Sequence, residues 1–277
     1  MCITVNHAKL SKTKILSLTL ESGNHFIAYS NTVVNLSGKP NAMILPIPGE
    51  TKPEWFHNTE SYKEFLDEIT DNSDFMKNYL GLISRSAKGI STLEKFELGM
   101  YSVGLSNDFD GIKQFINELP ENKRPVVSEE LQNFFQNKYA GWSFAICTFD
   151  SEKTIDAQPI AFEYKPFFTE FLYFPTMDGH DGKAPKIDSA VESDHTFIYE
   201  HTGSMEGELP EGRSYPYNKK FITLNAEVPM FLQNRKYRTI YQGGKVANSD
   251  TYIDLIELKK SNFSNHPTVH KSQPIAY

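Results

Sequence analysis

Alternating apolar and polar residues predict two β-strands near the start of the chain. Leu16, Leu18 and Leu20 alternate with polar residues, which is the two-residue period of a strand with one buried face. A Ser-Gly-Asn turn signal follows at residues 22–24, and a second apolar run covers residues 25–34. Two such runs around a short turn predict a β-hairpin.

A third strand is predicted at residues 42–48, where prolines interrupt an apolar run. Pro46 and Pro48 have no backbone N–H and cannot donate to a ladder of hydrogen bonds. The sequence therefore places this strand at an edge or at an end of its sheet.

An amphipathic helix is predicted next. Ser61 and Glu64 have the spacing of a capping box, and apolar residues at 62, 65, 66 and 69 repeat at helical spacing. After this helix, residues 96–106 have the pattern of a strand.

Two further helices are predicted from their capping residues and apolar faces. Asn107 or Asp108 can cap a helix over residues 109–119. Ser128, followed by two glutamates, can cap another whose apolar residues lie between 131 and 139.

Strand patterns return in the second half of the chain. They run from residue 142 to residue 202 and include the aromatic-rich segment 167–175, with a polar loop at residues 177–193. Glycine, proline, glutamate and asparagine then crowd residues 203–218, which suggests a boundary or a surface excursion.

A last pair of strands is predicted at residues 235–241 and 252–258, with Gly243-Gly244-Lys245 as a hairpin turn. Alternation places Lys236 and Arg238 on one face of the first of these strands, as expected for a solvated strand.

Helices grouped between two β blocks, without regular alternation of strand and helix, predict an α+β fold with largely antiparallel sheets. Residues 1–202 are expected to form an α+β core domain. Residues 203–277 are expected to form a C-terminal β extension packed on it, or to belong to the same single domain.

Composition narrows the function classes. The 277 residues are 39% hydrophobic and 13% aromatic, which suffices for a sizeable core. The net charge of −7 argues against broad binding to nucleic acid or to anionic membranes, because both require a basic surface. No run of about 18 apolar residues predicts a membrane span, and the first residues lack the apolar core of a signal peptide. A cytoplasmic location is therefore expected.

The chain has two cysteines, too few for a disulfide framework, which agrees with a reducing compartment. Cys147 lies in an apolar strand pattern and is expected to be a buried, inert thiol. Cys2 follows Met1 directly, so removal of Met1 would place a thiol and a free α-amine on one residue. With pKa values of about 8.5 for the thiol and about 8 for the amine, the amine can serve as the base.

Cys2 is therefore the candidate nucleophile of a hydrolase or amide transferase acting on a small molecule or a peptide amide. Such an enzyme needs an oxyanion hole, for which Asn6, Asn31, Asn35 and Asn41 are candidates. The competing interpretation is that Cys2 has no chemical role.

Five short motifs follow one another along the chain: residues 41–49 (NAMILPIPG), 101–103 (YSV), 139–144 (YAGWSF), 158–160 (QPI) and 172–175 (LYFP). In this order they resemble an uncharacterised bacterial family, domain of unknown function 2330. The resemblance covers roughly residues 1–202 and implies a shared fold without an activity. Members of that family are usually exported and carry a Cys-Gly pair near the mature N-terminus. Cys2 falls at the place of that cysteine, although Ile3 replaces the glycine and no export signal precedes it.

A divalent metal site is the competing chemistry. His180 and Asp181 in the polar loop, together with Asp194 and His195 at the start of a strand, carry the side chains that such ions prefer. The spacing matches no metal signature, and the aspartates and glycines of residues 178–182 are equally typical of turns. No other cofactor is predicted.

Two main classes of function follow. The first is a hydrolase that acts through Cys2 after removal of Met1. The second is a non-enzymatic β-rich module, structural or binding, that meets a protein partner through an edge strand or an aromatic cleft. A metal-dependent site around His180 and His195 is a further alternative.

Overall fold

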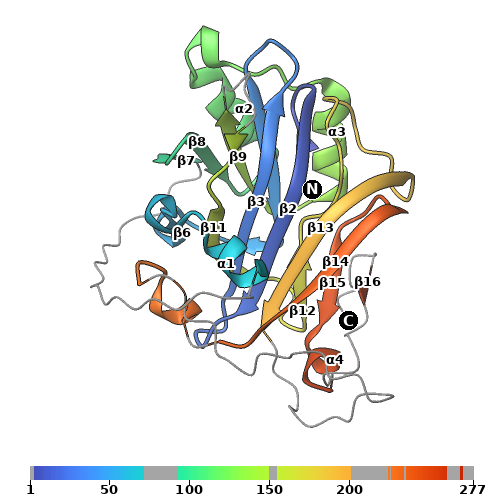
Figure 1. The fold of residues 1–277 in the computed structure, drawn as a ribbon. Helices are drawn as coiled ribbons and strands as arrows, with labels where there is room; N and C mark the ends of the chain where they lie inside the picture. Colours follow the sequence, from blue (N-terminus) through green and yellow to red (C-terminus); the bar gives the residue numbers. More distant parts are fainter. Residues whose placement is uncertain are drawn as a thin grey trace.

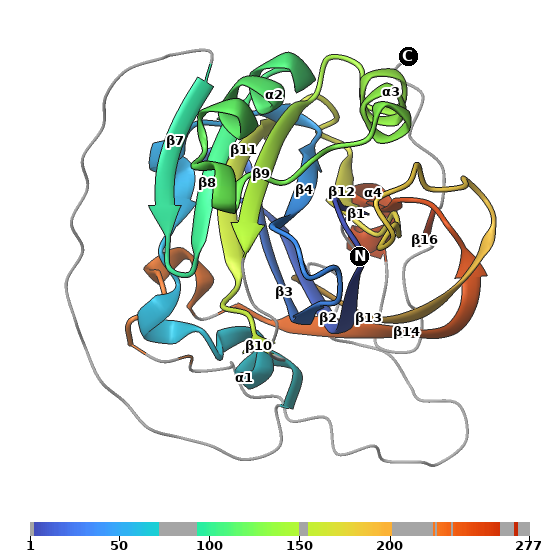
Figure 2. The same cartoon turned by 90° about the horizontal axis from the view of Figure 1, so that it is seen from above.

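The computed structural model describes residues 3–71, 93–149, 155–200, 224, 226–233, 235–260 and 269–270. Two β-sheets lie face to face, and helices cover the outer side of each sheet (Figures 1 and 2). The fold is α+β with largely antiparallel sheets, as the sequence predicts.

The smaller of the two facing sheets has five antiparallel strands in the order β1-β4-β9-β8-β7. Their bounds are Ile3–Thr4 for β1, Asn41–Ile47 for β4, Ser143–Phe149 for β9, Tyr101–Ser106 for β8 and Leu93–Leu98 for β7. The single strand predicted at residues 96–106 is therefore two strands. They turn at Gly99, whose φ of +56° is a conformation that glycine adopts without strain.

The prolines of β4 do not place the whole strand at an edge. β4 pairs with β9 from Asn41 to Ile47, and it also pairs with β1 at Met43 and Ile44. The edge prediction is thus wrong for the middle of the strand. Pro46 is tolerated because it lies outside the described pairing with β1.

The larger sheet has eight strands and is built around the predicted hairpin. Its main order is β14-β13-β2-β3-β11-β5, and β10 and β6 pair with β3 and β11. The bounds are Ala8–Thr19 (β2), His25–Asn35 (β3), Gly49–Glu50 (β5), Phe56–His57 (β6), Ile155–Asp156 (β10), Ile160–Pro166 (β11), Ala190–Glu200 (β13) and Tyr237–Ala247 (β14). β2 and β13 run parallel to each other.

Both faces of β2 and β3 are buried, whereas the sequence predicts one buried face. Leu16 and Leu18 pack under helix α1 (Phe65–Asp71) and the short helix η4 (Met230–Leu232). Ile15 belongs to the core between the two sheets, and Ser17 is fully buried as well. Ser17 therefore does not mark a solvent face, although Lys9 and Lys12 near the start of β2 are exposed.

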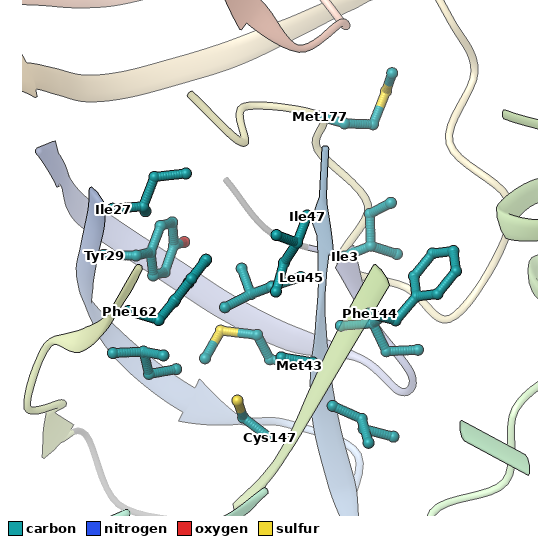
Figure 3. Close-up of a cluster of buried hydrophobic side chains, with 14 of the residues drawn as sticks. Ile3, Ile27, Tyr29, Met43, Leu45, Ile47, Phe144, Cys147, Phe162 and Met177 are labelled. Carbon is teal, nitrogen blue, oxygen red and sulfur yellow. The ribbon is translucent and has the colours of Figure 1, made fainter. Parts of the chain in front are cut away.

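The main core lies between the sheets (Figure 3). Met43 and Cys147 are cross-strand partners in the five-stranded sheet, and Figure 3 shows their side chains together with Phe162 and Tyr29 of the other sheet. Each fully buried side chain of this kind contributes roughly 1.5–3 kcal/mol. Cys147 is 0% exposed, so the prediction of a buried thiol is confirmed.

The predicted caps of the second and third helices are confirmed. In α2 (Phe109–Glu118) the side chain of Asp108 accepts a hydrogen bond from Gly111 N at 2.8 Å, which decides between the two candidate caps. In α3 (Glu129–Lys138) the side chain of Ser128 accepts from Leu131 N.

The capping box of the first helix is not formed. Ser61 lies inside a 3-10 turn, η2 (Glu60–Tyr62), and α1 begins only at Phe65. The apolar stripe is nevertheless correct, because Phe65, Leu66 and Ile69 are buried. Burial of the stripe, and not the cap, holds this helix in place.

The C-terminal segments differ most from the prediction. β14 runs through the predicted turn at Gly243 and Gly244 and pairs with β13 at every position from Tyr237 to Ala247. β15 (Thr251–Asp254) pairs instead with β12 (Phe171–Phe174) and β16 (Val269–His270), and α4 (Leu255–Lys260) replaces the second half of the predicted last strand.

The predicted boundary at residues 203–218 lies outside the described residues. The strands on either side of it, β13 and β14, are nevertheless partners in one sheet. None of the helices in the described part of the chain is long and apolar enough to cross a membrane.

Burial of His25 makes stability depend on pH. His25 is 1% exposed and packs edge-on against Tyr164, and desolvation lowers its pKa from 6.5 to about 4. As the pH falls below 6.5, the unfolded chain binds the proton first, so the free energy of unfolding decreases until about pH 4. A shift of this size corresponds to about 3 kcal/mol.

We expect His25→Gln to flatten the pH dependence of the free energy of unfolding in this window, measured by urea unfolding. The exposed His7 provides the matched site, since His7→Gln makes the same substitution without removing a buried ring. Equal slopes for His25→Gln and wild type would contradict the prediction.

Candidate functional site

The polar loop after β12 wraps around the N-terminal strand. Thr4 N donates to Gly179 O at 2.8 Å, and Ala8 N donates to His180 O at 2.9 Å. The hydroxyl of Ser128 donates to Gly182 O at 2.9 Å, so the loop also touches the start of α3. The loop that carries two of the predicted metal ligands thus holds β1 against the five-stranded sheet.

His180 lies beside the carboxylate of Asp178, but no third metal-ligating side chain joins the two in the described part of the chain. Its Nε2 lies 3.1 Å from Asp178 Oδ1, at an angle that does not make a hydrogen bond. Burial lowers the pKa of His180, against the raising effect of the Asp178 charge, so the ring is neutral at pH 7. Asp181 accepts a hydrogen bond from Lys183 N at 3.1 Å, as in the predicted turn.

His195 lies on the inner face of β13. Its Nδ1 is 3.0 Å from the hydroxyl of Ser193, which donates to Gln242 O at 2.9 Å, and both side chains are buried. Asp194 accepts a hydrogen bond from Lys12 N at 2.6 Å. In the part of the chain that the structure describes, no group of three or more such side chains could hold a metal ion, so His180, Asp181 and His195 gain no geometric support as a metal site.

Cys2 lies outside the described residues, and its role as a nucleophile stays a prediction. The four asparagines proposed as oxyanion donors are engaged elsewhere. The side-chain amides of Asn6, Asn31, Asn35 and Asn41 donate at 2.7 to 3.1 Å to backbone carbonyls or to a tyrosine hydroxyl. These bonds fix the turn between β3 and β4 and the inner face of β3.

A buried carboxylate that sequence reasoning missed ties the C-terminal part to the core. Tyr139 donates to Asp250 Oδ2 at 2.7 Å, and Tyr173 donates to Oδ1 at 3.3 Å. The backbone N–H groups of Thr176 and Met177 each donate to Oδ1 at 3.2 Å. Desolvation raises the pKa of Asp250, against the lowering effect of the bonds from Tyr139 and Met177.

Asn248 extends this cluster to the loop around β1. Its Nδ2 donates to Asp178 O at 2.8 Å, and its Oδ1 accepts from Asp178 N at 2.7 Å. Asp250 is 3% exposed and Asn248 is 2% exposed, so neither can meet a substrate. We infer that both residues anchor the segment after β14. No local sequence motif indicates this role.

Strand β14 ends the order of the described strands in the eight-stranded sheet. It pairs with β13 in one unbroken register from Tyr237↔Glu200 to Ala247↔Ala190. Among the described strands, β13 is its sole partner, so the opposite edge carries no described ladder.

The two faces of β14 differ. Thr239, Tyr241, Gly243 and Lys245 are exposed, and Tyr241 is 70% exposed with its ring against Gly243. On the other face Arg238 is only 5% exposed, which corrects the prediction that this residue lies on a solvated strand.

A shallow groove of about 440 Å³ lies along α3, lined by Phe134, Ala184 and Ile187 and by the polar residues Glu130, Asn133, Asn137 and Lys138. The groove is open, and Glu130, Asn133 and Asn137 are exposed, so its lining offers no set of convergent buried polar groups.

No protein-family model matches the sequence, and no curated protein is recognisably similar to it. The resemblance to domain of unknown function 2330 therefore stays an expectation.

Several solved structures match the chain at TM-scores below 0.5. Baculovirus p35 has a TM-score of 0.43 and 16% identity, covering 92% of each chain. A mutated baculovirus p35 after caspase cleavage has a TM-score of 0.46 and 15% identity, covering 89% of this chain and 98% of that one. The caspase-8/p35 complex has a TM-score of 0.39 and 15% identity, covering 88% of this chain and 87% of that one. At this level of similarity the comparison carries no argument about fold or activity.

We expect Asp250→Ala to lower the free energy of unfolding by about 2–5 kcal/mol, because it leaves two hydroxyls and two backbone donors without their buried acceptor. Tyr139→Phe should cost less, about 1–2 kcal/mol. The exposed Asp110, on α2, provides the control, since Asp110→Ala should cost about 1 kcal/mol or less. Urea unfolding measures all three, and an Asp250→Ala effect no larger than that of the control would contradict the assignment.

We expect Cys147 to resist a thiol reagent at neutral pH, because it is fully buried. The variant Cys2→Ser has Cys147 as its one remaining cysteine. Intact mass should then show no label on the native protein and one label after denaturation. Stoichiometric labelling without denaturant would contradict the described core.

Proposed function

We propose that this chain is a non-catalytic binding module that takes an extended segment of a partner protein onto the edge of β14 that faces away from β13, where the described strands form no ladder. The single observation that carries the proposal is the length and regularity of this edge strand. Eleven residues pair with β13 without a register shift, while mean strand length in proteins is about 5–6 residues.

The edge of β14 lacks most of the devices that normally prevent strand addition. Proteins protect edges with short strands, prolines, bulges and charged residues. β14 contains no proline, and Lys245 is the one charged residue on its exposed face. The opposite end of the same sheet is β5, which has two residues, and the edge strand β7 of the other sheet has six.

Strand addition draws its affinity from main-chain hydrogen bonds and its specificity from alternate side chains. An added strand would lie beside Thr239, Tyr241 and Lys245 on one face and beside Ile240 and Val246 on the other. The exposed Tyr241 offers an aromatic surface of the kind that is enriched at protein interfaces.

Peptides of about ten residues, the length of β14, provide the test. Binders selected from a random display library should protect the backbone amides of residues 237–247 from hydrogen exchange. The double variant Thr239→Lys/Tyr241→Lys should weaken their binding about tenfold or more, because two lysines beside Lys245 protect the edge. Val126→Lys is the matched control, because Val126 is 77% exposed on a segment outside both sheets.

Peptides that protect amides elsewhere in the chain, or that bind the double variant as well as wild type, would contradict the proposal. Caspase-8, which one of the similar structures contains, is tested beside the peptides. Binding of caspase-8 that survives the double variant would show that another surface recognises partners.

The hydrolase hypothesis is tested separately. Intact mass of natively produced protein shows whether Met1 is retained, and a retained Met1 on active protein would remove the N-terminal nucleophile because it blocks the amine of Cys2. Under the binding proposal, Cys2→Ser should bind the selected peptides as well as wild type does.

A further inference from the structure

We draw no further inference here: the strongest candidate, the open groove along α3, has an apolar floor and one lining charge of each sign, Glu130 and Lys138, and nothing in the structure shows what covers it.

Discussion

Strands β2 and β3 carry apolar side chains on both faces, and this two-sided burial is the constraint around which the fold is arranged. Residues such as Ile15 require the five-stranded sheet on one side, and residues such as Leu16 require α1 and η4 on the other. Apolar burial of this extent supplies most of the stability of a domain this size. The hairpin therefore acts as the middle layer, between the five-stranded sheet on one side and α1 and η4 on the other.

The polar groups inside the fold join distant segments of the chain through hydrogen bonds. Asp250, Asn248 and the loop around β1 form a chain of short hydrogen bonds between segments that are far apart in sequence. Buried polar groups of this kind cost free energy unless every one has a partner. The same cluster holds the residues that directly follow β14. Strand β14 itself ends the order of the described strands in its sheet.

A sequence prediction succeeds where the structure depends on contacts between residues close in sequence, and fails where it depends on contacts between distant segments. The caps Asp108 and Ser128 bond within three residues of themselves, and the β2–β3 hairpin closes over a short turn, so both could be predicted. Ser17, Arg238 and Asp250 are buried by segments distant in sequence, which no periodicity reveals. The sequence did not predict the full length of β14, because Gly243 and Gly244 are typical of a turn, although here they lie within a strand. For the proposed site, the sequence indicated an edge-strand mode in general terms but not which strand would provide it.

The parallel pairing of β2 with β13 has a consequence for biosynthesis. Lys14 is the register partner of Thr196, so roughly 180 residues separate the two strands along the chain. At about 5–20 residues per second the ribosome needs about 10–40 s to deliver β13 after β2 has emerged. Throughout that interval both apolar faces of the nascent hairpin and the edge of β2 that later pairs with β13 are uncovered. We expect chaperones that bind nascent chains to recognise such a hairpin.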